Sequence, residues 1–231
     1  MSMQFGQHLK EEDLFRDFPA EKKSFKSLSI RRYVKKGEFV FYEGDPGDSC
    51  FYLEEGFVKI FQVSVMGKEP ILMLRKAGEI FGLAEALGGF ERKANAQAIR
   101  PCVFYEIDKE SFDEFLSLHY AIARRIMTVL GRRLRYLCDQ VGNLMVCDVT
   151  TRLLKHLIYF CYPRLLDSDS WDRPITFSLD LTQEQIASMT GSCQQTVSET
   201  LKKLQSEGII FIAGKEITLL NPLQIVQRIS V

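Results

Sequence analysis

The sequence predicts an α+β chain in which strands and helices are segregated along its length. Residues 37–107 contain short runs of alternating apolar residues separated by glycines, which is typical of antiparallel strands. A sustained apolar repeat then runs through residues 109–144, as in a long helix. Short helical patterns and a final pair of strands follow. With 46% hydrophobic and 26% charged residues, the chain has enough apolar material for sizeable cores.

The strand-rich segment, assigned to a domain of residues 1–108, is expected to form a jelly-roll or double-stranded β-helix. Nine of the 15 glycines lie between Gly37 and Gly89, where they supply turns. The expected strands are Glu38–Tyr42, Cys50–Leu53, Phe57–Val63, Ile71–Leu74 and Val103–Ile107. A barrel-shaped metal oxygenase would need clustered histidines, but His8, His119 and His156 all lie outside this segment. We therefore expect a domain that senses a small molecule, and no enzyme.

Residues 109–146 are expected to form one long dimerisation helix, running from about Lys109 to Leu144. Its apolar positions step alternately by three and four residues, which is the period of a coiled coil. These seam positions are Tyr120, Ala123, Met127, Leu130, Leu134, Leu137, Val141 and Leu144. The charged positions expected to face solvent are Arg124, Arg125, Arg132, Arg133 and Arg135. The seam favours a parallel homodimer, and the alternative is a seam packed on the barrel of its own chain.

Residues 147–231 are expected to contain a helix-turn-helix between Leu181 and Leu204. Thr182 with Gln185, and Ser192 with Gln195, match the capping box that begins a helix. Gly191 between the two helices can take the positive φ of a sharp turn.

A strand pair after the second helix predicts that this domain is a winged helix-turn-helix. Gly208 would end the helix, and the two strands would be Ile209–Ile212 and Glu216–Leu220. Ala213-Gly214-Lys215 would form the turn of this two-stranded wing. The wing would cover the apolar side of the helices and complete a core.

The second helix carries a polar stripe suited to the major groove of double-stranded DNA. Val197, Leu201 and Leu204 would face the core. The outward positions are Gln194, Gln195, Ser198, Glu199 and Lys202. Lys215 of the wing and the helix starts at Thr182 and Ser192 would contact DNA phosphates. The alternative is an ordinary solvated face in which Gln195 serves only as a capping residue.

The charge balance does not favour DNA binding by bulk attraction. Residues 148–231 carry eight Lys or Arg against nine Asp or Glu, a net charge of −1, whereas residues 1–147 carry 22 against 21. Non-specific attraction to phosphates should consequently be weak. Binding would depend on a few placed donors.

Cysteine usage and apolar runs point to an ordinary cytoplasmic protein. The six cysteines are scattered without a CxxC pair, so we expect isolated buried thiols and neither disulfides nor an iron–sulfur site. No apolar run approaches the length of a membrane span, and residues 1–8 lack the pattern of a leader peptide. We expect no membrane partner.

Several segments together resemble the cyclic-AMP receptor protein and FNR (CRP/FNR) family of bacterial transcription regulators. Besides the helix-turn-helix, they are Phe41–Asp48, Phe51–Gly56, Gly78–Gly82, Val141–Leu144 and Asp148–Arg152. The resemblance implies a cyclic-nucleotide-binding-like barrel, a homodimer on a palindromic operator, a small-molecule effector that acts allosterically, and RNA polymerase as a partner. A protein with ligand sensing as its main role, for a cyclic nucleotide or a haem-bound gas, is the alternative.

The effector contacts that the resemblance implies fall on Gly82, Leu83, Glu85, Arg92, Lys93, Leu134, Leu137 and Cys138. Members that bind cyclic AMP hold the phosphate with an Arg-Ser pair, the ribose with a Glu and the base with a Thr-Ser pair. Arg92 matches the arginine, but Lys93 replaces the serine and Leu83 replaces the glutamate. Leu137-Cys138 replaces Thr-Ser. Each lost hydrogen bond removes roughly 1–3 kcal/mol, which disfavours cyclic AMP.

Two questions about these positions stay open at the level of sequence. The effector could be an acidic metabolite, an apolar metabolite or haem with a diatomic gas, and Arg92 could anchor it or be an ordinary surface ion-pair partner. The reading helix also departs from the family, which often has Arg or Glu at the positions of Gln194 and Gln195, and Arg at that of Glu199. The operator half-site should therefore differ from the common one.

Overall fold

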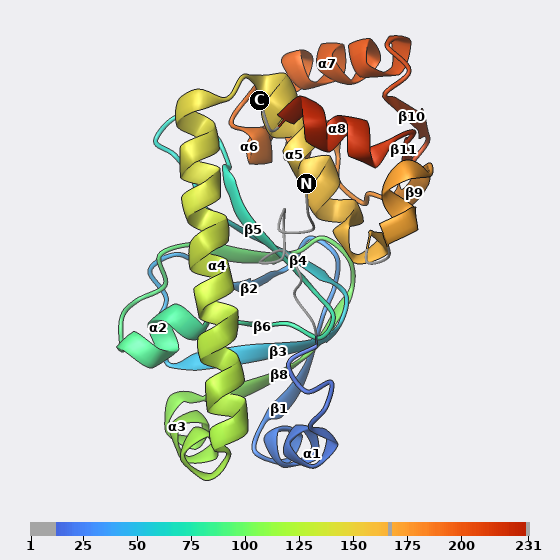
Figure 1. Ribbon diagram of the computed structural model, residues 1–231. Helices are drawn as coiled ribbons and strands as arrows, with labels where there is room; N and C mark the ends of the chain where they lie inside the picture. The colour runs from blue at the N-terminus through green and yellow to red at the C-terminus, as the bar shows by residue number, and fades with distance from the viewer. Residues whose placement is uncertain (1–12, 166–167, 230–231) are drawn as a thin grey trace. The chain divides into compact units, whose positions relative to one another are not determined.

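The computed structural model describes residues 13–165 and 168–229 of the chain (Figure 1). The described residues form two compact units, residues 13–131 and residues 132–229. The division falls inside helix α4 (Tyr120–Val146), so each unit contains a part of that helix. The domain boundaries at residues 108 and 146 stay a prediction.

The first unit contains two four-stranded antiparallel sheets, as the jelly-roll prediction requires (Figure 1). One sheet has the order β1 (Ile30–Val34), β8 (Cys102–Asp108), β3 (Ser49–Glu55), β6 (Ile80–Phe81). The other has the order β2 (Phe39–Phe41), β7 (Asn95–Ala98), β4 (Phe57–Phe61), β5 (Ile71–Lys76). Sequence patterns did not predict β1, β6 and β7, because β1 is largely exposed, β6 is two residues long and β7 has no β-branched residue.

Aromatic side chains fill the core that the strands of this unit enclose. Phe51 lies 5.1 Å from Phe81 and 5.5 Å from Phe104, measured between ring centroids. Phe41 stacks on Phe51 at 5.6 Å. All four rings are buried, together with small and branched residues of β4 and β7. The core that these strands enclose is therefore apolar, except where a charged side chain enters it.

The single helix expected from Lys109 to Leu144 is wrong, because the chain leaves the helical conformation at His119. The two helices are α3 (Lys109–Leu118) and α4, and His119 between them has φ −122° and ψ 67°. Its ring packs on Phe115 at 4.6 Å between centroids, and its Nε2 lies 3.4 Å from Ser24 Oγ of α1 (Pro19–Ser27). The break lets both helices pack on one cluster around Phe25. The apolar repeat runs through the break and so did not reveal it.

The second unit is built around helix α5 (Val149–Cys161) and a small sheet. The following elements are the 3₁₀ turns η2 (Tyr162–Arg164) and η3 (Ser168–Asp172), β9 (Ile175–Ser178), α6 (Gln183–Thr190), α7 (Gln194–Ser206), β10 (Ile210–Ala213), β11 (Glu216–Leu219) and α8 (Pro222–Ile229). One continuous core joins α5, α6, α7, α8 and the sheet. This arrangement confirms the winged helix-turn-helix prediction.

The predicted two-strand hairpin of the wing is present, and a third strand, β9, which the sequence patterns did not indicate, extends it. The order is β10-β11-β9, and all pairs are antiparallel. Phe177 of β9 pairs with Ile217 of β11, and both side chains are buried. The apolar-polar alternation of Ile175-Thr-Phe-Ser178 covers only four residues, which is a short strand pattern. The partner strand of β9 lies about 40 residues away in the chain.

Candidate DNA-binding interface and effector site

The first helix of the motif, α6, begins and ends as its sequence predicts. Thr182 Oγ1 accepts from the backbone N–H of Gln185 at 3.1 Å, and Gln185 Oε1 accepts from the N–H of Thr182 at 2.9 Å. This capping box satisfies two donors that a helix start leaves unpaired. Gly191 ends α6 in the left-handed conformation, with φ 61° and ψ 40°.

The second helix, α7, begins one residue later than expected, so the capping box at Ser192 is wrong. The N–H of Ser192 donates to Ala187 O at 3.0 Å, which makes Ser192 part of the closing turn of α6. Cys193 is the N-cap residue, and its side chain makes no capping hydrogen bond. Its Sγ lies 3.1 Å from Thr196 Oγ1, and hydrogen bonding by Thr196 lowers the pKa of this exposed thiol.

Helix α7 turns its polar stripe to solvent and its apolar stripe to the core. Val197, Leu201 and Leu204 are buried. Of the stripe expected to read bases, Ser198 is half-buried and the exposed residues are Gln194, Gln195, Glu199 and Lys202. Gln195 Nε2 donates to Glu199 Oε1 at 3.0 Å, so the side chain of Gln195 belongs to the outward face. The interpretation of Gln195 as a capping residue is therefore wrong.

Two side chains of α5 hold the turn between α6 and α7 in place. Arg152 Nε donates to Thr190 O at 2.7 Å, and its Nη1 donates to Cys147 O at 2.6 Å. His156, one turn further on, is buried, and its Nε2 lies 3.2 Å from Met189 O. Burial lowers the pKa of His156 to about 4, so the neutral ring donates to this carbonyl.

Sequence patterns did not indicate a role for Arg152 or His156. Both residues lie on one side of a largely buried helix, four positions apart. A polar pair at that spacing on a buried helix is a signal for a buried hydrogen-bonding role. Its target, the carbonyl end of α6, depends on the tertiary fold.

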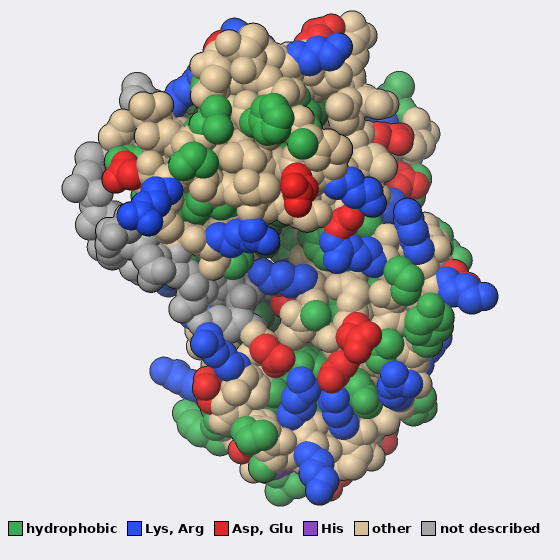
Figure 2. All heavy atoms as spheres, turned by 90° about the vertical axis from the view of Figure 1, so that its right-hand side faces the viewer, with side chains coloured by type: hydrophobic (Ala, Val, Ile, Leu, Met, Phe, Trp, Pro, Cys, Tyr) green, Lys and Arg blue, Asp and Glu red, His purple; other side chains and the backbone are tan. Residues whose placement is uncertain are grey.

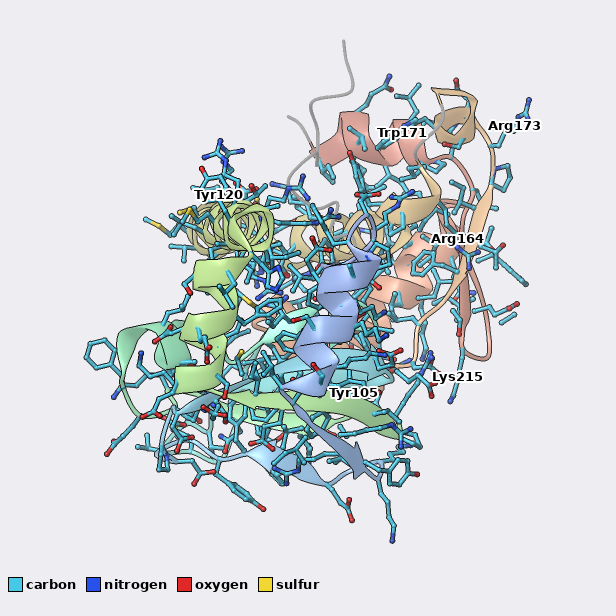
Figure 3. All side chains as sticks on the ribbon, turned by 90° about the horizontal axis from the view of Figure 1, so that it is seen from below. Tyr105, Tyr120, Arg164, Trp171, Arg173 and Lys215 are labelled. Atoms are coloured by element: carbon cyan, nitrogen blue, oxygen red, sulfur yellow. The ribbon has the colours of Figure 1, made fainter. Side chains whose placement is uncertain are left out.

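Positive charge near the reading helix is partly compensated by acidic neighbours. Lys215, at the turn between β10 and β11 (Figure 3), lies 3.4 Å from Asp180, and Lys203 lies 3.9 Å from Glu207. Figure 2 shows Lys and Arg side chains interspersed with Asp and Glu on the face in view. With a net charge of −1 for residues 148–231, few donors are available to hold a phosphate backbone.

Most of the predicted seam on α4 is exposed. The exposed seam residues are Tyr120 (Figure 3), Met127, Leu134, Leu137, Val141 and Leu144. Ala123 and Leu130 are half-buried, and Leu130 packs against the barrel cluster. Ile122 and Ile126, on another face of α4, are buried in that cluster. The first part of α4 thus packs on the barrel unit with one side, and an apolar stripe along α4 is left uncovered.

Three of the five arginines expected to face solvent are not fully exposed, and Arg132 is one of the two that are half-buried. Arg125 is half-buried and donates to Asp17 Oδ2 at 3.0 Å and to Asp13 O at 3.1 Å. Arg133 is 9% exposed. It follows the buried Ile126 by two helical turns and shares its face, which a coiled-coil repeat alone does not reveal.

Arg92 is a buried cation and not a surface residue, so the surface ion-pair alternative is wrong. Its side chain is among the largest fully buried ones. Its Nη1 donates to Gly82 O at 2.9 Å, and its Nη2 donates to Ser49 O at 2.5 Å. The guanidinium lies over the ring of Phe41, 4.4 Å from the centroid.

The other predicted effector residues differ in their exposure. Gly82, with φ 74°, precedes helix α2 (Leu83–Gly88), whose Leu83 is buried in the core. Glu85 of α2 is half-buried and lies 3.5 Å from Arg92. Lys93 is exposed. Leu134, Leu137 and Cys138 lie on exposed positions of α4 in the second unit.

Neither histidines nor cysteines form a metal-binding group in the described part of the chain. His119 and His156 make the structural contacts given above, and His8 lies outside the described residues. No cluster of three or more His, Cys, Asp or Glu side chains could hold a metal ion within residues 13–165 and 168–229. Cys50, Cys102 and Cys161 are buried as expected, but Cys138 and Cys193 are exposed.

Comparisons with protein-family models agree with both halves of this architecture. The model "Cyclic nucleotide-binding domain" matches residues 31–119, and the model "Crp-like helix-turn-helix domain" matches residues 151–227. The chain belongs to the CRP/FNR family. Members of this family are transcription regulators with a helix-turn-helix domain, and the chain is therefore a DNA-binding regulator and not an enzyme.

Curated relatives extend over most of the chain at modest identity. The cAMP-activated global transcriptional regulator CRP of Salmonella typhimurium is 28% identical over 189 residues, which cover 81% of this chain and 88% of that protein. The CRP-like cAMP-activated global transcriptional regulator of Mycobacterium tuberculosis is 27% identical over 193 residues, covering 84% and 85%.

Solved structures share the CRP/FNR fold. A mutant of CooA from Carboxydothermus hydrogenoformans has a TM-score of 0.79 at 22% identity and covers 96% of this chain and 97% of that one. FixK2 from Bradyrhizobium japonicum has a TM-score of 0.74 at 20% identity, covering 86% and 96%. Among the described residues of this family member, no helix has both the length and the apolar character needed to cross a membrane.

Proposed function

We propose that this regulator binds a palindromic operator sequence-specifically as a homodimer and responds to an effector other than cyclic AMP. The observation that carries the proposal is the outward polar face of α7. Gln194 and Gln195 can contact adenine bidentately, and Glu199 can accept from N4 of cytosine. Because the domain has a net charge of −1, base contacts must contribute a large share of the binding free energy.

Dimerisation through α4 would complete the DNA-binding unit. The exposed apolar stripe repeats at coiled-coil spacing, and a single helix with such a stripe gains most by pairing with a second copy. Two-fold symmetry would place two copies of α7 about one turn of DNA apart. The operator would then be an inverted repeat.

Cyclic AMP is disfavoured by the residues around Arg92. The curated relatives described above are cAMP-activated by name, but a solved structure of CLP from Xanthomonas campestris is described as c-di-GMP responsive, so one fold serves different effectors. Here Leu83 is buried in the core and Lys93 is exposed, so neither offers the serine or glutamate contact of the cyclic-AMP-binding members. Calorimetric titration with cyclic AMP should detect no binding, and micromolar affinity would overturn this part of the proposal.

The response to an effector is proposed as a population shift. An effector bound in the barrel would change the conformation of α4 and of the segment Met145–Cys147 that follows it. Arg152 bonds both to Cys147 O and to Thr190 O, which provides a direct mechanical link between that segment and the turn before α7. Operator affinity should differ with and without a cell extract's small-molecule fraction. We also infer RNA polymerase as a partner and the cytoplasm as the location.

DNA selection tests the proposed function directly. Purified protein is incubated with random duplex DNA, and bound molecules are sequenced through several rounds. An inverted repeat is the expected product. Mass spectrometry and an absorption spectrum of the same preparation would identify any co-purifying effector, including haem.

A further inference from the structure

The buried cations of the barrel each have a carboxylate partner. Arg92 lies 3.5 Å from Glu85, Lys59 lies 2.6 Å from Glu69, and Arg75 lies 3.3 Å from Glu79. Buried charges are costly unless they are paired, so such pairing is expected on physical grounds. Lys59 of β4 and Arg75 of β5 pair with glutamates of the two loops that flank β5. Arg92 instead pairs with a residue of α2, near the predicted effector position Leu83.

The guanidinium of Arg92 has little hydrogen-bonding capacity left for a ligand. Nη1 is shared between Gly82 O and Glu85 Oε2, and Nη2 is shared between Ser49 O and Ser49 Oγ. Only Nε is buried without a hydrogen-bond partner. Phe41 covers one face of the group.

Glu85 is placed to govern which ligands can reach this arginine. The side chain of Arg92 is 1% exposed, whereas that of Glu85 is 18% exposed, so the carboxylate is the more accessible member of the pair. An anion approaching Arg92 from solvent would meet the carboxylate of Glu85 at close range. Like charges that close destabilise each other strongly at a partly buried site, and Glu85 would have to leave before the anion could bind.

We propose that Glu85 is a specificity-determining residue, a built-in anion that closes the Arg92 site to negatively charged effectors. The effector class that the barrel accepts is consequently uncharged. This inference rests on the proposed role of the barrel as the sensing part of the regulator. It replaces the expectation that Arg92 anchors an acidic metabolite.

A charge-neutral replacement separates the carboxylate's charge from its shape. Glu85→Gln keeps the size of the side chain and a carbonyl oxygen near Arg92 but removes the negative charge. Glu91→Gln is the matched control, because Glu91 is exposed and lies next to Arg92 in sequence. Both variants are made in the full chain, and circular dichroism establishes that they fold.

The test is a thermal-shift and calorimetric titration with inorganic phosphate and, separately, with cyclic AMP at constant ionic strength. We expect no saturable binding of either probe to the wild type or to Glu91→Gln. We expect saturable phosphate binding to Glu85→Gln, with an affinity at least about tenfold above the weakest that the titration detects. Saturable phosphate binding to the wild type would overturn the inference. So would a Glu85→Gln variant that behaves like the wild type, or an equal gain in Glu91→Gln. No DNA is present, so these outcomes are independent of whether the protein binds an operator.

Discussion

Gln195 Nε2 donates a hydrogen bond to Glu199 Oε1 over 3.0 Å, across one turn of α7. Both side chains are exposed on the face proposed to read DNA. Each therefore holds the other in position before DNA arrives, which reduces the conformational entropy lost on binding. Because of this hydrogen bond, a substitution at Glu199 alters the environment of Gln195. The effects of substitutions at the two positions on DNA-binding free energy should therefore not be additive.

Replacing reading residues should relax specificity at defined base positions. Glu199→Ala or Gln194→Ala should cost roughly 1–3 kcal/mol of binding to the selected operator and lose discrimination at one base pair. Affinities are measured by fluorescence anisotropy on single-base operator variants at fixed salt. Gln205→Ala, on the exposed last turn of α7, is the control and should change nothing. Unchanged base preference in both reading variants would refute the assignment of this face.

A charge in the exposed stripe of α4 should prevent dimerisation. Leu134 is 65% exposed in the isolated chain, so Leu134→Glu leaves the protomer's fold intact but would bury a carboxylate in the proposed interface. Sedimentation velocity should show a monomer for this variant and a dimer for the wild type. Arg135→Glu, beside it but off the stripe, is the control and should remain dimeric. A dimeric Leu134→Glu variant would exclude the stripe as the interface.

The buried His156 should make the protein sensitive to acid. Burial holds the pKa of His156 at about 4 in the folded state, below its ordinary value of 6.5. As pH falls through 6.5, the unfolded chain takes up a proton that the folded chain refuses until about pH 4, so stability is lost across this window. The loss from this group should approach about 3 kcal/mol.

Urea unfolding from pH 7 to pH 4 measures this effect. His156→Gln keeps an N–H donor for Met189 O but cannot titrate, so its stability should depend less steeply on pH. Parallel pH profiles for the two proteins would show that His156 is not responsible.

The turn between the two motif helices should require glycine. Gly191 has φ 61°, and a Cβ there would lie 2.9 Å from Leu144 Cδ2. Gly191→Ala should therefore destabilise the fold by about 1–2 kcal/mol from backbone strain alone. Gly142→Ala, within α4 with no heavy atom near its Cβ position, should instead stabilise by about 0.5–1 kcal/mol. Thermal denaturation compares the two, and equal shifts would contradict the explanation.

What the sequence predicted well is what short-range chemistry decides. The capping box at Thr182 and the left-handed turn at Gly191 depend on a few neighbouring residues, and both are present as expected. The start of α7 was misplaced by one residue because Ser192 is taken up by the end of α6. The break at His119 and the third wing strand depend on packing partners distant in sequence, which a local pattern does not contain.

The candidate sites divide in the same way. The polar stripe of α7 and the apolar stripe of α4 follow from helical periodicity, and their exposure agrees with it. The burial and pairing of Arg92 do not follow from periodicity, because Ser49, Gly82 and Glu85 come together around it only in the folded barrel. The sequence offered Arg92 as a ligand anchor or a surface residue, and its burial excludes the surface residue.

Selection of DNA ligands from a random duplex pool is the most direct test that this chain reads a palindromic operator as a dimer through α7. The account predicts an enriched inverted repeat, with half-sites centred about one helical turn apart, that is lost when Leu134→Glu protein is used. Enrichment of no sequence, or of a single unrepeated half-site that the Leu134→Glu variant selects equally well, would contradict it.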